Sequence, residues 1–133
     1  SSLLARFARN EFNLETRSTV EAEFANGSVS VEGKTCMLQI FDAQPDLGGS
    51  GFAPERLRAI MSASHYKGIV GAVFVYDVTK KSSFENLKKW LDELKDNAKE
   101  GITMMLVGNK SDLAKHRVIT TKQGKAFADR NGM

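Results

Sequence analysis

Two apolar runs constrain the fold of this chain more than any other feature. They occupy residues 69–76 and 102–107, and neither shows a regular alternation of apolar and polar residues. Such runs are typical of parallel strands that are buried on both faces. Residues 84–98 between them carry apolar side chains at helical spacing. A strand–helix–strand order of this kind predicts an α/β fold with a parallel sheet.

The expected helix between these strands has one apolar face, and it carries lysines mostly outside that face. Ser82 and Glu85, three residues apart, predict a capping box at its start. We expect Trp90 to pack beside the apolar face. A second capping box, formed by Thr120 and Gln123, is expected to open a last helix. The apolar face of the first helix consists of Phe84, Leu87, Leu91, Leu94 and Ala98.

The first part of the chain predicts a different set of elements. Residues 2–9 have helical spacing, and residues 10–20 are polar and read as an exposed loop. Residues 22–31 and 34–41 resemble strands, and Glu32-Gly33 between them predicts a hairpin. Val31, Leu38 and Ile40 are the core candidates of this hairpin. Glycine and proline predict a loop at 43–54, and a helix is expected at 55–65.

Length and composition limit the class of protein. A length of 133 residues predicts one domain, 1–133, and an apolar fraction of 41% is ordinary for a soluble globular protein. The net charge is +3, and the basic residues are scattered or lie on a helix face, so a solvated surface is expected and no nucleic-acid site. The longest apolar run is far shorter than the roughly 20 residues of a membrane helix. Cys36 has no cysteine partner, which predicts a reduced core thiol and a cytoplasmic location.

The polar segment Asn109-Lys110-Ser111-Asp112 directly follows the second apolar run. Ligands of parallel sheets bind beyond the carboxyl ends of the strands. The carboxylate of Asp112 is suited to accept two hydrogen bonds from the adjacent N–H donors of guanine, which adenine lacks, and charge-assisted bonds are strong. The stem of Lys110 can lie along a base, and Asn109 can brace the loop. The alternative is an ordinary polar loop between a strand and a helix.

One expected partner of such a loop is missing from the sequence. No segment reads G-x-x-x-x-G-K-[ST], the loop whose backbone N–H groups hold phosphates. The chain begins Ser1-Ser2-Leu3-Leu4, and this start is expected to lie just inside such a motif.

Seven segments together resemble the Rab family of Ras-like small GTPases, most closely its recycling-endosome subgroup. The similarity covers nearly all of the chain except residues 43–54. The segments are SSLLARF (1–7), NEFNLETRST (10–19), VEGKT (31–35), LQIFD (38–42), ERLRAI (55–60), VYDV (75–78) and VGNKSDL (107–113).

The resemblance implies a switch that binds GTP or GDP together with Mg²⁺, a cation that prefers oxygen ligands. Matched by position, the hydroxyl of Ser1 and that of Thr19 contact Mg²⁺, and Asp42 holds Mg²⁺ through water. Each has a plain alternative: Ser1 as a chain end, Thr19 as a loop residue and Asp42 as the end of a strand.

The resemblance also implies that Asn109, Lys110 and Asp112 read guanine. The implied fold is an α/β, P-loop-NTPase-like domain with a mostly parallel sheet and flanking helices. As written, it lacks the first strand and phosphate loop, and also the last strand and helix. We therefore expect weakened nucleotide binding.

The sequence departs from the family pattern in its second switch. Ala43-Gln44-Pro45 follows Asp42, so the glutamine that orients the attacking water has no clear counterpart. No catalytic residue is assigned, and hydrolysis is expected to be poor. The aromatic trio that effectors contact in the family reads Phe24, Phe41 and His65 here, so effector choice cannot be carried over.

Two functional interpretations remain open. The first is a Rab-like switch in vesicle traffic with impaired nucleotide binding, whose partners are guanine nucleotide and Rab regulators and effectors. Membrane attachment, to endosomes or other vesicles, is expected only through a tail that this sequence does not contain. The second is a non-enzymatic interaction module with a GTPase-like fold, or an incomplete gene product.

Overall fold

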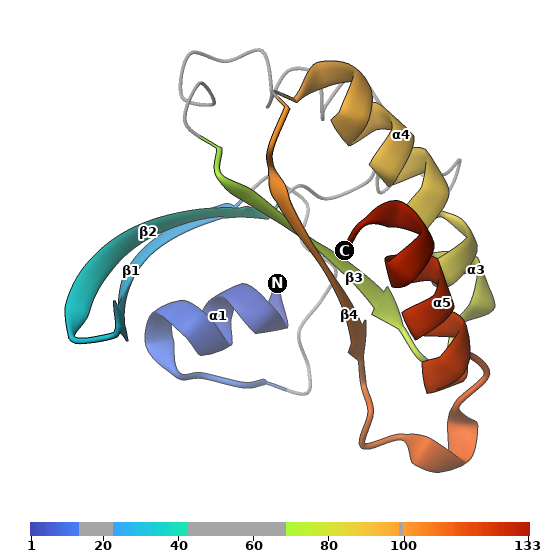
Figure 1. Ribbon diagram of the computed structural model, residues 1–133. Coiled ribbons are helices and arrows are strands. Elements are labelled where there is room, and N and C mark those ends of the chain that lie inside the picture. The colour runs from blue at the N-terminus through green and yellow to red at the C-terminus, as the bar shows by residue number, and fades with distance from the viewer. Residues whose placement is uncertain (14–22, 43–68, 99) are drawn as a thin grey trace. The chain divides into compact units, whose positions relative to one another are not determined.

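A computed structural model describes residues 1–13, 23–42, 69–98 and 100–133 (Figure 1). The chain divides into two compact units, Ser1–Arg56 and Leu57–Met133, and each is described by itself. The predicted loop at 43–54 and the predicted helix at 55–65 lie outside the described residues, as does most of the predicted loop at 10–20.

The first unit begins with helix α1, Ser2–Arg9, as predicted. Ser1 is its N-cap, and the hydroxyl of Ser1 accepts the N–H of Leu4 at 3.4 Å. The helix ends at Asn10, which adopts the left-handed conformation with φ 56°. The guanidinium of Arg6 donates to the backbone and side-chain oxygens of Asn10, which places a cation at the negative end of the helix dipole.

The predicted hairpin is confirmed. Strand β1, Glu23–Val31, pairs with strand β2, Lys34–Asp42, in antiparallel fashion (Figure 1). Glu32 and Gly33 both have positive φ, 49° and 75°, which is the backbone that tight two-residue hairpin turns require.

Helix α1 packs closely against β1 at a glycine. A Cβ placed on Gly27 would lie only 2.6 Å from Cζ of the Phe7 ring, so the ring occupies the space that a larger residue would need. Gly27 lies opposite Leu38 in the register, and Leu38 is half-buried. The contact fixes which face of the hairpin is covered.

Two expectations for the hairpin are wrong. Val31 is 54% exposed rather than part of the core, and Cys36 is exposed rather than a buried thiol. Both residues lie at the turn end of a two-stranded ribbon, where little chain surrounds a side chain. Leu38 and Ile40, further from the turn, are half-buried.

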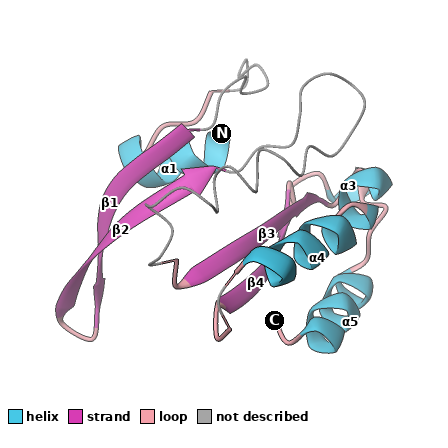
Figure 2. Ribbon diagram, turned by 90° about the horizontal axis from the view of Figure 1, so that it is seen from above, coloured by secondary structure: helices cyan, strands magenta, loops and turns pink. Residues whose placement is uncertain are grey.

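The second unit contains the predicted parallel pair of strands. Strand β3, Gly71–Asp77, pairs with strand β4, Thr103–Asn109. Helices α3 (Lys81–Glu85), α4 (Leu87–Asn97) and α5 (Thr121–Asn131) lie on one side of these strands, as Figure 2 shows. A short 3₁₀ helix, η2 (Ala114–His116), follows β4.

The core of this unit lies between the strands and the helices. The predicted apolar helix face is confirmed, because Leu87, Leu91 and Leu94 are buried there, and Trp90 packs against the cluster as expected. Phe84 extends this apolar cluster through an edge-to-face contact with Tyr76, with the two ring centroids 5.0 Å apart. The buried cluster consists of Phe74, Tyr76, Val78, Leu87, Leu91, Leu94 and Ile119.

The expectation that both faces of the two strands are buried is wrong for the described residues. The side chain of Val73 is 63% exposed, that of Val75 is 41% exposed and that of Met105 is 59% exposed. Successive side chains of a strand point to opposite faces. Because α3, α4 and α5 lie on one side, alternate apolar residues of β3 and β4 face away from them.

The predicted capping box at Ser82 is also wrong. The N-cap is Lys80, two residues before Ser82, and it makes no side-chain capping bond; the helix begins at Lys81. Glu85 instead forms an ion pair with Lys81 at 3.3 Å. The helical path is interrupted at Asn86, so α3 and α4 replace the single helix that was expected.

The second predicted capping box is confirmed. The hydroxyl of Thr120 accepts the N–H of Gln123 at 3.2 Å, and Oε1 of Gln123 accepts the N–H of Thr120 at 2.8 Å. Two of the backbone donors at the start of α5 are satisfied in this way.

Candidate guanine-nucleotide site

The polar loop predicted to read guanine begins where β4 ends. Oδ1 of Asn109 accepts the N–H of Lys110 at 2.8 Å, so Asn109 braces the loop as expected. Lys110 adopts the left-handed conformation with φ 62°, and the N–H of Leu113 donates to its carbonyl at 3.0 Å. The left-handed conformation costs a non-glycine residue roughly 1–2 kcal/mol. The loop therefore has a defined shape that its hydrogen bonds help to maintain.

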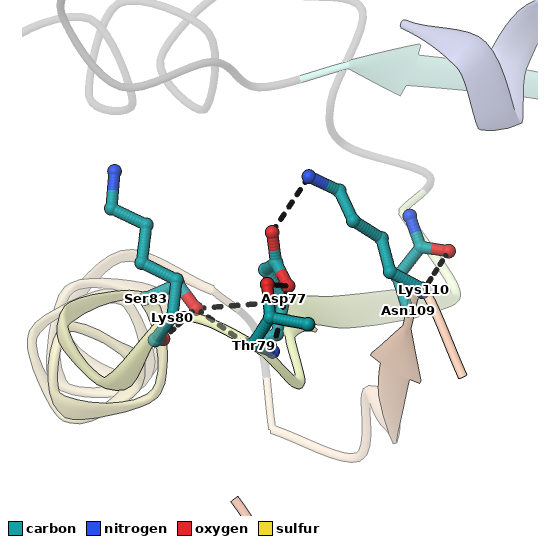
Figure 3. A network of polar contacts seen from close by, with 6 residues as sticks. All are labelled: Asp77, Thr79, Lys80, Ser83, Asn109 and Lys110. Atoms are coloured by element: carbon teal, nitrogen blue, oxygen red, sulfur yellow. Dashed lines mark hydrogen bonds and ion pairs between the residues drawn. The ribbon is translucent and has the colours of Figure 1, made fainter. Parts of the chain in front are cut away.

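The side chain of Lys110 has a partner that sequence reasoning missed. Its Nζ lies 2.7 Å from Oδ2 of Asp77, the last residue of the neighbouring strand (Figure 3). The register pairs Asp77 with Asn109, so both strands end at the same edge. The rule that parallel strands place their carboxyl ends together indicates a shared edge from the sequence, but the contact itself depends on the strand register.

Further hydrogen bonds hold Asp77 in place. Oδ1 of Asp77 accepts the backbone N–H of Thr79 at 2.8 Å and its hydroxyl at 2.6 Å. The backbone N–H of Asp77 donates to the hydroxyl oxygen of Ser83 at 3.0 Å, and the same hydroxyl contacts the carbonyl of Lys80 at 2.6 Å. This use of Ser83 ties the end of β3 to the start of α3.

These contacts set the charge of the carboxyl group. Burial raises the pKa of Asp77, but the bonds from Lys110 and Thr79 outweigh burial and lower the pKa below its ordinary value of 3.8. Asp77 is therefore ionised at neutral pH, and the contact with Lys110 is an ion pair between full charges.

Asp112, the predicted guanine-reading residue, follows in the turn after β4. Its side chain is exposed and has no hydrogen bond or ion pair within 69–98 and 100–133. Both oxygens are thus open to a ligand that offers paired N–H groups. Asn109 ends β4, and Lys110 and Asp112 follow it in the turn.

Two of the three predicted metal ligands lie together in the first unit. The terminal ammonium of Ser1 is 3.9 Å from Oδ2 of Asp42, the last residue of β2. That separation is an ion-pair distance but too long for a hydrogen bond, and this oxygen is buried with no hydrogen-bond partner. Thr19 lies outside the described residues.

Of these two residues, Asp42 offers a carboxylate oxygen to a hard cation, whereas the hydroxyl of Ser1 caps α1 and the ammonium of Ser1 is the group near Asp42. Carboxylate and hydroxyl oxygens are the ligands that Mg²⁺ prefers, and a buried carboxylate oxygen without a hydrogen bond is stabilised by a cation. The described residues contain no group of three or more His, Cys, Asp or Glu side chains that could hold a metal. A Mg²⁺ ion at Asp42 would therefore need further oxygen ligands, such as phosphate and water.

Comparison with known proteins identifies the class of this domain. The whole chain, residues 1–133, matches the family model described as the Ras family. The chain therefore belongs to the Ras family, and its α/β fold is that of a small GTPase.

Within that family the similarity is to the Rab branch, as the sequence motifs indicated. The chain is 51% identical over 131 residues to the Ras-related protein rab-11.1 of Caenorhabditis elegans. The alignment covers 98% of this chain and 58% of that relative, so the chain spans little more than half of its length. The resemblance to the recycling-endosome Rab subgroup is confirmed. Among the described helices, none is long and apolar enough to cross a membrane.

Proposed function

We propose that this chain is a Rab-type switch that binds GTP or GDP and Mg²⁺ and acts in vesicle traffic at endosomal membranes. The observation that carries the proposal is the loop after β4, in which Asn109 and Lys110 are held in place and Asp112 is open. The 51% identity to a Rab protein supports the traffic role. Rab regulators and effectors are the partners that this role needs.

Guanine selectivity follows from the chemistry of the loop. A carboxylate at Asp112 accepts two N–H groups from guanine, and adenine has neither of these donors at the corresponding positions. A site that hydrogen-bonds a substrate rejects an analogue that lacks the donors, because its own polar groups then stay unpaired. Lys110 offers its aliphatic stem to the base.

Mg²⁺ supplies positive charge for the phosphates when it is bound. Asp42 and Ser1 are the described residues that would hold it, with Thr19 as a third by family position. No catalytic residue is proposed. Because Ala43-Gln44-Pro45 follows Asp42 and leaves the water-orienting glutamine without a clear counterpart, we propose that hydrolysis is slow.

A titration tests the proposal. The 133-residue chain is titrated with a fluorescent guanine nucleotide and Mg²⁺, with the adenine nucleotide as comparison. Asp112→Asn should weaken guanine binding by about tenfold or more, because the amide replaces one acceptor oxygen by a donor and removes the charge.

The matched control is Asp129→Asn. Asp129 is an exposed carboxylate of the same unit, paired with Lys125 on α5, and its replacement should leave binding unchanged. Equal binding of the guanine and adenine nucleotides, or no effect of Asp112→Asn, would contradict the proposal.

The exposed face of the hairpin favours a second candidate function. Phe24 is 63% exposed and Met37 is 77% exposed, and the rings of Phe24 and Phe41 lie 6.1 Å apart. Exposed apolar side chains of this kind mark contacts with other proteins. An interaction module that captures Rab partners with or without nucleotide is thus the alternative, and capture that is insensitive to GTP, GDP and chelator would support it.

A further inference from the structure

We propose that Asp77 is a positioning residue for the nucleotide site: it fixes the side chain of Lys110 in the guanine loop before the nucleotide arrives. The proposal rests on the guanine-nucleotide binding proposed above and deepens it. It assigns a role to a residue outside the loop itself.

The two oxygens of Asp77 have separate tasks. Oδ1 accepts both bonds from Thr79, while Oδ2 lies 2.7 Å from Nζ of Lys110 (Figure 3). A carboxylate held through one oxygen cannot rotate freely, so the position of the other oxygen is defined. The bond from the N–H of Asp77 to Ser83 fixes the backbone beneath it.

Lys110 needs such a partner because it has a long, flexible stem. Its side chain is 53% exposed, and an exposed lysine samples many rotamers. Ordering such a side chain on binding opposes association, and ordering it beforehand favours it. Asp77, 19% exposed, is the fixed point at which the lysine stem ends.

The ion pair is therefore better suited to orientation than to stability. Exposed ion pairs contribute little to folding, and Lys88–Asp92, 3.0 Å apart within α4, is a pair of that kind. The Asp77–Lys110 pair instead joins the ends of two strands and crosses the edge where ligands of parallel sheets bind.

A double-mutant cycle on nucleotide affinity tests the proposal. The unaltered 133-residue chain, Asp77→Asn, Lys110→Gln and the double variant are each titrated with a fluorescent guanine nucleotide and Mg²⁺. Asp77→Asn keeps the size of the side chain and an oxygen for Thr79 but removes the charge that faces Lys110. We expect it to weaken binding roughly tenfold in the unaltered chain and to have no further effect in the Lys110→Gln chain.

Two controls accompany the cycle. Asp92→Asn breaks a lysine–aspartate pair away from the loop and should leave affinity unchanged. Circular dichroism and thermal unfolding report whether each variant is folded. If Asp77→Asn does not fold, Thr79→Val takes its place, because it removes the hydroxyl that holds Oδ1 and keeps every charge.

Each outcome decides the matter. A loss that appears only when Lys110 is present supports the proposal, because a purely structural role would weaken binding in both backgrounds. An unchanged affinity, or an equal loss in both backgrounds, overturns it and leaves the proposed function intact. If the unaltered chain shows no guanine-selective binding, the proposed function fails, and the role of Asp77 fails with it.

Discussion

The phenolic oxygen of Tyr76 lies 2.5 Å from the point that a Cβ on Gly124 would occupy. The same oxygen lies 2.8 Å from the corresponding point on Gly108. Tyr76 belongs to β3, Gly108 to β4 and Gly124 to α5, so one buried hydroxyl reaches both neighbouring elements. The absence of side chains at these two glycines allows α5 to pack closely against β3 and β4.

Gly124→Ala should therefore destabilise the chain. Overpacking typically costs about 1–3 kcal/mol, and the better helix propensity of alanine offsets up to about 1 kcal/mol of this. Denaturant unfolding measures the loss. In a Tyr76→Phe background the oxygen is gone, and the same substitution should become neutral or stabilising. A similar loss in both backgrounds would contradict the packing described for Tyr76.

The stability contributed by Asp77 should depend on pH in a defined direction. The pKa of Asp77 is lower in the folded chain than its ordinary value of 3.8. Its contribution is therefore complete above that ordinary value and disappears as the pH falls through the lowered, folded value. We expect the difference in unfolding free energy between the unaltered chain and Asp77→Asn to shrink on acidification below 3.8. A difference that stays constant would argue against the ion pair with Lys110.

The two capping boxes predicted from sequence should respond differently to mutation. Thr120→Ala should cost about 1 kcal/mol, because it leaves the N–H of Gln123 without its acceptor. Ser82→Ala should change stability by less than about 0.5 kcal/mol, because Ser82 is not the N-cap of α3. Thermal unfolding of both variants measures these changes in stability. A larger loss of stability for Ser82→Ala than for Thr120→Ala would contradict the assignment of Thr120 as an N-cap and of Ser82 as a residue without that role.

These two boxes show where a local pattern decides a helix start and where it does not. Thr120 and Gln123 form their reciprocal bonds within one turn, so the sequence alone predicts them. At Ser82 the same pattern competes with a contact across the unit: the hydroxyl of the next residue, Ser83, accepts the N–H of Asp77. That contact depends on where β3 ends, which a local pattern does not contain.

In the hairpin and in the candidate site too, some features follow from the local sequence and others depend on contacts between distant residues. Helical spacing and the pair Glu32-Gly33 were enough to predict α1 and the turn, and the polar segment after the second apolar run was enough to predict a loop after β4. The guanine-reading role of that loop stays a prediction. The exposure of Cys36 and Val31 depends on which face α1 covers, and the Asp77–Lys110 pair depends on strand register. The spacing of apolar residues in a single strand predicts neither which face another element covers nor the register with the neighbouring strand. The assignment of Thr19 stays a prediction.

Removal of Mg²⁺ should separate the roles of Asp42 and Asp112. Chelation should weaken guanine-nucleotide binding by the unaltered chain, because Mg²⁺ neutralises phosphate charge. Asp42→Asn should lower the affinity for the guanine nucleotide, and chelation should then have little further effect. Asp112→Asn should also lower the affinity, but chelation should still weaken the binding that remains. Titrations with and without chelator measure both. An unchanged sensitivity in Asp42→Asn would remove Asp42 from the metal site.

The most direct test of guanine recognition is a map of backbone amide shifts by nuclear magnetic resonance. GDP with Mg²⁺ is added to the ¹⁵N-labelled chain, and ADP with Mg²⁺ is the comparison. We expect GDP to shift the amides of residues 109–112 and of Asp77, and ADP to leave them in place. Equal shifts with both nucleotides, or GDP-dependent shifts that avoid residues 109–112, would contradict the assignment of this loop as the guanine site.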